Sequence, residues 1–92
     1  MNNFRKSDLR TGMILETDTG ERCVVLLNTE NGNVACGHTY MLLDNLDENL
    51  VSINTGPIMK IWQPNCNMAT SEAIIDKNCD MNHPWYKLLF ER

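Results

Sequence analysis

Two pairs of cysteine and histidine are the residues whose types and spacing first suggest chemistry. One residue separates Cys36 from His38, and three separate Cys79 from His83. Together the pairs could supply the four ligands of a zinc site. Structural zinc sites, however, are usually built from short-spaced pairs such as Cys-x-x-Cys, and the chain has none. We therefore expect no metal, and we interpret the four cysteines as reduced thiols in a cytoplasmic protein.

The same two histidines are the candidates for acid–base catalysis, and neither belongs to a recognisable catalytic motif. His38 follows a glycine and His83 precedes a proline, which is more typical of a turn or a cap than of a general base. The five glycines are scattered singly, so no phosphate-binding loop is present. The carboxylates in residues 44–48 lack the spacing of a calcium loop. We expect a non-enzymatic protein without catalytic residues or a cofactor.

Large aromatic side chains make binding a better prospect. Trp62 lies two residues before Pro64, and Trp85 directly follows Pro84. Rings in strands usually fill the core, but a small barrel rarely buries two tryptophans completely, and exposed rings are typical of interface centres. We expect the two tryptophans to flank one groove beneath residues 65–83. The predicted ligand- or partner-binding residues are Trp62, Trp85, Tyr86, Tyr40, His83 and Lys60.

The elements that must position these rings are mostly strands. Apolar and β-branched runs predict strands over residues 13–17, 22–27, 34–36, 39–43 and 58–62, and the apolar run in 22–27 favours a central position. Gly12 suits a left-handed turn, Gly20 closes a second turn, and Asn31-Gly32 is a strong hairpin signal. Residues 44–50 suggest one helical turn with Leu46 and Leu50 on one side.

Two short helical segments and the chain end complete the prediction. Ser7 is expected to cap a turn over residues 8–10, and a short helix is expected over residues 71–78. For residues 85–92 we favour a strand with Tyr86, Leu88 and Phe90 on one face. The alternative is a helix that shares one face among Trp85, Leu88 and Leu89.

Length and composition place these elements in one small domain. Ninety-two residues with 42% hydrophobic content suffice for a single modest core, so residues 1–92 are expected to form one mainly β barrel with a distinctive 65–83 loop. No apolar run approaches the roughly 18 residues that span a bilayer. The first six residues include two basic ones, Arg5 and Lys6, but no apolar stretch follows them, which indicates no secretion signal and favours the cytoplasm.

Charge is distributed unevenly along the chain. The net charge is −4, and residues 11–56 hold seven acidic residues against one basic residue. Such a chain lacks the basic face that neutralises nucleic-acid phosphates, so we expect no nucleic-acid binding. An acidic surface instead suits the basic site of a partner protein.

Several segments together resemble a known group of proteins. They are Ser7-Asp8-Leu9-Arg10-Thr11-Gly12-Met13, the turn at Gly20, Val24-Val25-Leu26, the strand Ile58–Trp62 before Pro64, and the closing Leu89-Phe90-Glu91-Arg92. This pattern resembles small uncharacterised phage and prophage proteins of Gram-positive bacteria. The resemblance implies an SH3-like barrel of five to six antiparallel strands with one or two short helical segments. It implies no particular activity.

Two classes of function follow. The first is a phage-type binding module that interacts with a host protein or counters host defence by occupying a host protein's site. The second is an oligomer that binds a small nucleotide-like ligand and sequesters an immune signal of the host. In either case a homo-oligomer is expected, because the edge of a terminal strand and spare aromatic surface favour pairing.

Overall fold

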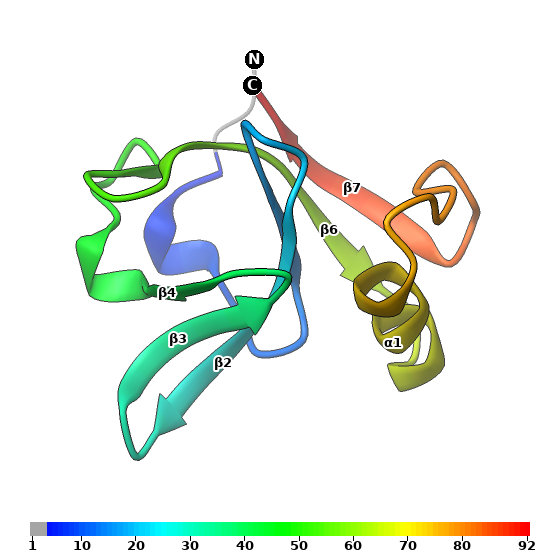
Figure 1. Cartoon of the computed structure of the whole chain (residues 1–92), viewed down its shortest axis with the longest axis horizontal. Helices are drawn as coiled ribbons and strands as arrows, with labels where there is room; N and C mark the ends of the chain where they lie inside the picture. Colours follow the sequence, from blue (N-terminus) through cyan, green and yellow to red (C-terminus); the bar gives the residue numbers. More distant parts are fainter. Residues whose placement is uncertain (1–3) are drawn as a thin grey trace.

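A strongly curved antiparallel sheet with one short helix on its outer side forms this protein, in a computed structural model that describes residues 4–92 (Figure 1). The elements are η1 (Lys6–Asp8), β1 (Ile14–Thr17), β2 (Arg22–Thr29), β3 (Gly32–Gly37), β4 (Tyr40–Leu42), η2 (Leu43–Asn45), β5 (Val51–Ser52), β6 (Gly56–Pro64), α1 (Asn67–Ile75) and β7 (Tyr86–Glu91). The strand order is β4-β3-β2-β1-β6-β5, and β7 also pairs with β6. The mainly β, barrel-like class is therefore confirmed.

Local turn chemistry sets the first three strands. Gly12, Gly20 and Gly32 have φ values of +98°, +84° and +89°, in the left-handed region that glycine accepts without strain. They stand before β1, between β1 and β2, and at the tip of the β2–β3 hairpin. β2 lies between β1 and β3, as its apolar run predicted. The strand expected over 39–43 is shorter, because η2 begins at Leu43.

The register of the strands separates their side chains into two apolar clusters. On the inner face of the curved sheet, Leu15 pairs with both Cys23 and Ile61, and Ile61 pairs with Phe90. Leu46 and Leu50 complete this inner core. The helical turn expected over residues 44–50 is only the 3-10 turn η2, so both leucines follow it instead of sharing one side of a helical turn. Its members are nearly inaccessible to solvent, and each fully buried aliphatic side chain contributes about 1.5–3 kcal/mol.

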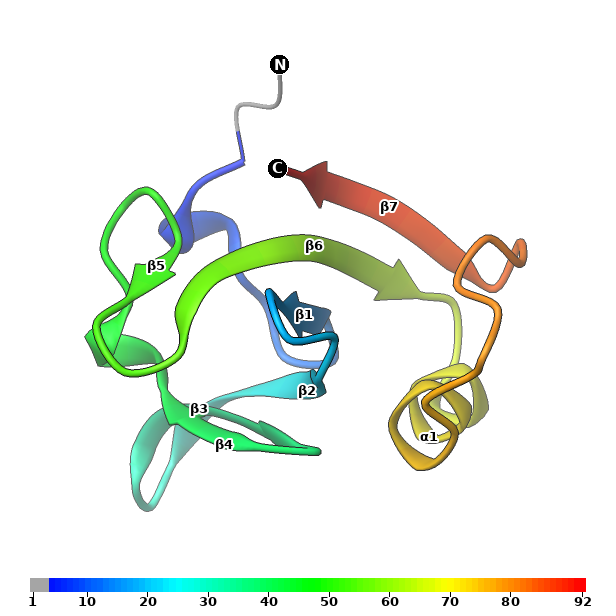
Figure 2. The ribbon, with the colours of Figure 1, turned by 45° about the horizontal axis from the view of Figure 1, so that its top comes forward.

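A second, smaller core lies on the outer face, where α1 packs against the sheet. Ala69 and Ala73 are one helical turn apart and fully buried. Their small side chains let the helix approach Ile14 and Trp62 of the neighbouring strands β1 and β6. Residues 76–85, here called the covering segment, then return across this face to β7, as Figure 2 shows. This outer core explains why both faces of β1 and β6 carry apolar residues.

Three expectations about element boundaries require correction. Ser7 does not cap the first turn: the 3-10 helix begins after Arg5, whose N–H donates to the Asp8 carboxylate at 2.9 Å. The helix expected over 71–78 begins at Asn67, after extended Cys66, and ends at Ile75. It ends early because the Asp76 carboxylate accepts the Asn78 N–H, which favours a turn there.

The chain end is a strand, as favoured, but its side chains do not share one face. The β6–β7 register shifts between Ile61 and Trp62, which face Phe90 and Leu88, so Leu89 is an extra residue. Phe90 therefore joins the inner core while Tyr86 joins the outer one. Arg92 then donates hydrogen bonds to the backbone carbonyls of Asn49, Leu50 and Ile58.

Candidate functional site

A row of alternating charges crosses the outer face of four adjacent strands. Arg22 pairs in register with Glu16, Glu16 with Lys60, and Lys60 with Glu91. Arg22 Nε lies 3.6 Å from Glu16 Oε1, and Lys60 Nζ lies 3.5 Å from Glu91 Oε2. Opposite charges at paired positions of neighbouring strands attract, so the alternating order of the four charges stabilises the sheet.

Arg22 anchors the outer layer to the sheet. Its side chain is 9% exposed and reaches across to the end of α1. Nη1 donates to the carbonyl oxygens of Ala73 (3.3 Å) and Asp76 (3.2 Å), and Nη2 donates to that of Cys79 (3.4 Å). A guanidinium at a helix C-terminus satisfies carbonyls that lack partners within the helix. The buried Nε makes no hydrogen bond with any residue of 4–92, and the Glu16 carboxylate is its ion-pair partner.

The covering segment is shaped by two similar turns and one buried tyrosine. The carboxylates of Asp76 and Asp80 accept the N–H of the residue two positions ahead, at 2.9 and 3.0 Å. Tyr86 donates its hydroxyl to the Ala69 carbonyl at 2.6 Å and lies 3.4 Å from the Cys79 sulfur. Burial and then the Cys79 contact raise the pKa of the Tyr86 hydroxyl, so it stays a protonated donor.

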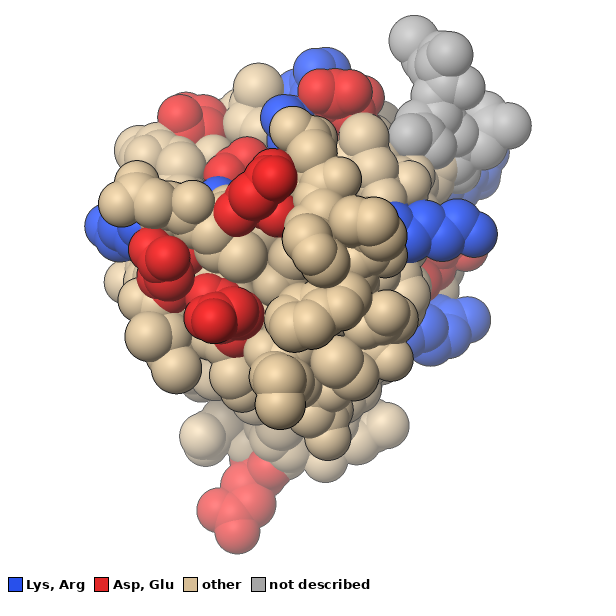
Figure 3. Space-filling model, turned by 90° about the vertical axis from the view of Figure 1, so that its right-hand side faces the viewer, with Lys and Arg blue, Asp and Glu red and all other residues tan. Residues whose placement is uncertain are grey.

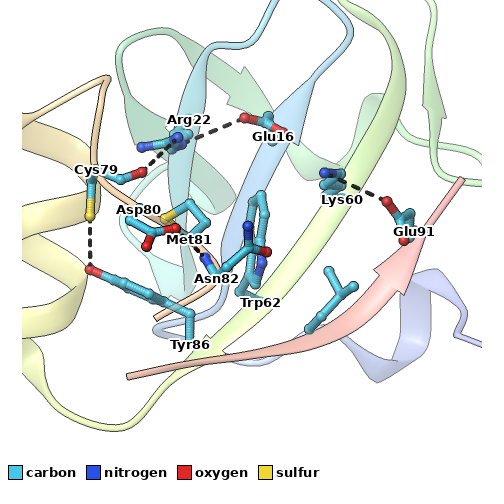
Figure 4. A pocket seen from close by; sticks show the side chains of 11 residues that line it. Glu16, Arg22, Lys60, Trp62, Cys79, Asp80, Met81, Asn82, Tyr86 and Glu91 are labelled. Carbon is cyan, nitrogen blue, oxygen red and sulfur yellow. Dashed lines mark hydrogen bonds and ion pairs between the residues drawn. The ribbon is translucent and has the colours of Figure 1, made fainter. Parts of the chain in front are cut away.

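Between the charged row and the covering segment lies a cavity of about 510 Å3 (Figure 4). Its apolar lining is Trp62, Met81, Tyr86 and Leu88, and Cys79 and Asn82 contribute polar groups. Its charged lining is Glu16, Asp80 and Glu91 against Arg22 and Lys60. This volume falls within the range of small-molecule and side-chain pockets. The lining carries a net charge of −1, and within residues 4–92 Asp80 has no ion-pair partner.

The structure brings together half of the residues predicted for binding. Trp62, Tyr86 and Lys60 line the cavity. Trp85 is partly buried against the outer core but does not line the cavity, so the two tryptophans do not flank one groove. Tyr40 lies on β4, at the far end of the strand order from β6 and β7.

The two histidines accept backbone hydrogen bonds. His83 Nδ1 accepts the N–H of Trp85, and the two rings meet edge to face at 5.1 Å. His38 Nδ1 accepts the N–H of Arg22 at 3.2 Å. Each ring therefore holds a turn, and neither belongs to the cavity lining. Among residues 4–92, no three His, Cys, Asp or Glu side chains group closely enough to hold a metal ion.

The four cysteines are free thiols in different settings. Cys23 is fully buried in the inner core, and burial raises its pKa to about 11. Cys66 is exposed just before α1, and Cys79 is partly buried in the covering segment. Of the four cysteines, Cys79 is the one that lines the cavity.

Sequence reasoning missed Arg22, Glu16 and Asp80 as site residues. The alternation of β1 and β2 places Glu16 and Arg22 on one face, which was a usable signal. Their neighbours across the sheet depend on register, and the contacts of Arg22 span more than 50 positions in sequence. For Asp80 the sequence indicated only a turn and no role in a site.

The face that α1 and the covering segment form has a distinct charge pattern. Figure 3 shows several Asp and Glu side chains gathered on one half of this face, with Lys and Arg mainly at its margins. Within residues 4–92, no helix has the length and apolar character that crossing a membrane requires. Comparisons with family models, curated proteins and solved structures gave no significant match.

Proposed function

We propose that this chain is a non-enzymatic binding module that occupies a site on a partner protein by accepting a basic side chain in the outer cavity. The observation that carries the proposal is an apolar lining combined with the Asp80 carboxylate, which has no cation partner among the described residues 4–92. Leu88, 46% exposed, can contact the aliphatic stem of a lysine or arginine. Asp80 can then accept its charged end.

The surroundings of the cavity support a positively charged partner. Acidic side chains gather on this face, and the chain as a whole carries a net charge of −4. Complementary charge speeds association and disfavours acidic competitors. The resemblance to phage proteins makes a host-cell protein the partner class that we propose, with interference in host defence as the consequence.

The alternative function, sequestration of a nucleotide-derived signal, finds less support in the cavity. A phosphate needs cations that are free to meet it. Arg22 and Lys60 each already lie within 4 Å of a carboxylate, at 3.6 and 3.5 Å. Asp80 adds a further negative charge that would repel phosphate.

A random-peptide display library selected against the immobilised domain tests the proposed function. We expect selected peptides to contain lysine or arginine beside an aliphatic or aromatic residue. Asp80→Asn removes the charge but keeps an oxygen for the turn, and should weaken these peptides about two- to fivefold, as expected for an exposed ion pair. Asp76→Asn is the matched control, because Asp76 makes the same type of turn outside the cavity lining.

Leu88→Lys is the stronger perturbation, since it places a positive charge in the cavity lining that repels the basic side chain of the peptide. We expect at least about a tenfold loss of peptide affinity. Peptides that bind both cavity variants as tightly as the wild type would show that this cavity is not the site. A panel of cyclic and linear nucleotides is tested in parallel by thermal shift. Clear stabilisation by a nucleotide would favour the sequestering alternative.

A further inference from the structure

Within residues 4–92, three strands of the curved sheet pair with one strand only: β4 and β5, which end the strand order, and β7, which pairs with β6. β5 has only two residues, and on its other side Ser52 forms a bridge with Leu46, so β4 and β7 are the strands with an open edge. A free edge presents alternate N–H and C=O groups that can pair with another chain. The two edges differ in ways that determine which one is available.

The β7 edge carries features that oppose pairing. The register shift at Leu89 is a bulge, which bends the strand and interrupts a regular ladder. The exposed charges of Lys87 and Glu91 lie on either side of this bulge. Bulges and edge charges are the devices by which natural sheets prevent edge-to-edge association. The terminal strand, which the sequence favoured for pairing, is therefore poorly suited to it.

The β4 edge has none of these features. Its three residues pair with β3 in unbroken register, with Tyr40 opposite Cys36 and Leu42 opposite Val34. Tyr40 and Leu42 share the outer face and are 53% and 41% exposed, whereas Met41 faces the inner core. No residue of the strand is charged.

The apolar character of this edge continues inward along the sheet. Behind Tyr40, the register places Cys36 and then Val24 on the same face. Behind Leu42 it places Val34 and then Leu26. α1 contacts β2 and β6, and no contact of comparable extent joins it to β4. An uncharged apolar face thus extends to a free, regular edge.

We propose that two copies of this chain pair antiparallel through β4, about a twofold axis at Met41. In this register Tyr40 packs against Leu42 of the second copy, and Leu42 against its Tyr40. An aromatic ring opposite a branched aliphatic side chain is a favourable cross-strand pair. Charge also favours this edge: each copy carries −4, so two copies can approach best where neither brings charge.

The size of the interface predicts a weak, reversible dimer. A three-residue strand and two exposed side chains bury less than the roughly 1,200 Å2 typical of stable complexes. Dimerisation should therefore depend on concentration between the micromolar and millimolar ranges. Higher salt should strengthen it slightly by screening the net charge.

Sedimentation velocity over that concentration range, with four variants, tests the proposal. Tyr40→Glu and Leu42→Lys should each give monomer at every concentration, because each buries an unpaired charge. The double variant Y40E/L42K should regain the dimer, since the register sets the carboxylate at position 40 opposite the ammonium at position 42 of the other copy. That dimer, unlike the wild-type one, should weaken in salt. Lys87→Glu on β7 should leave the wild-type dimer unchanged.

Other results would overturn the proposal. They are a wild-type protein that stays monomeric at millimolar concentration, a double variant that does not regain the dimer, or a dimer that K87E dissociates. Thermal unfolding of each variant verifies that it is folded. The outcome is independent of the proposed function, because Tyr40 and Leu42 do not line the cavity.

Discussion

Replacing Arg22 with methionine tests whether one side chain holds the outer layer to the sheet. Methionine keeps most of the apolar stem but has no donor. The substitution therefore removes three hydrogen bonds, of 3.2–3.4 Å, to the carbonyls of Ala73, Asp76 and Cys79. It also leaves the Glu16 carboxylate without its cation.

The expected loss can be worked out from these contacts. A hydrogen bond from a charged donor contributes about 1.5–3 kcal/mol. These three bonds are long, and water can reach the part-buried carbonyls once the guanidinium is gone. We therefore expect a total loss of about 2–4 kcal/mol in the free energy of unfolding, a large part of the roughly 5–14 kcal/mol typical of a 92-residue domain.

Urea unfolding followed by tryptophan fluorescence measures this loss, because Trp62 is buried in the outer core. Hydrogen exchange should show where it acts: amides of α1 and the covering segment should lose protection before those of β2 and β3. Glu16→Gln is the control, since it removes the ion pair at 3.6 Å but keeps a polar side chain of the same size beside Arg22 and leaves the three hydrogen bonds of the guanidinium in place; it should cost less than about 1 kcal/mol. A stability of R22M within about 0.5 kcal/mol of wild type, or equal loss of protection throughout, would refute the reasoning.

Three further predictions concern single residues. Gly37→Ala should lower the thermal midpoint by several degrees, because a Cβ there would lie 2.5 Å from the Arg22 carbonyl oxygen; an unchanged midpoint would contradict this contact. Tyr86→Phe should cost about 1–2 kcal/mol in urea unfolding, since it removes the buried hydrogen bond from the hydroxyl to the Ala69 carbonyl. The pKa of Cys23 is raised from 9.0 to about 11, so folding favours the neutral thiol and its contribution is complete below pH 9. Between pH 9 and 11 the free energy of unfolding should fall by roughly 2 kcal/mol more in wild type than in C23A. Equal pH profiles of the two proteins would contradict a raised pKa of Cys23.

The parts of the fold that the sequence predicted are those that local chemistry decides. Gly12, Gly20 and the Asn31-Gly32 pair indicate turns because their backbone needs are local. The central place of β2 follows from its apolar composition alone. The site was only half predictable, because Trp62 and Tyr86 were conspicuous as rings whereas their charged neighbours were not.

What the sequence could not show depends on contacts between distant segments. The bulge at Leu89 places Phe90 and Leu88 on different faces, and nothing in an alternating apolar pattern marks an extra residue. Arg22 at the start of a strand suggests an exposed charge. Its burial depends on carbonyls that the covering segment brings to it. These hydrogen bonds of Arg22 exist only once α1 and the covering segment have packed on the sheet, so the sequence around Arg22 does not indicate them.

The short helix links the two surfaces that this structure leaves open. Nine helical residues span about 13 Å, and strands lie about 4.8 Å apart, so α1 can cover about three strands of a seven-stranded sheet. It lies over the region of β1 and β6, where Ala69 and Ala73 meet Ile14 and Trp62. On one side of the helix the covering segment crosses above the charged row and leaves the cavity. On the other side Tyr40 and Leu42 of β4 stay 53% and 41% exposed, which leaves the apolar edge. The proposed binding cavity and the proposed pairing edge are thus two consequences of one incomplete outer layer.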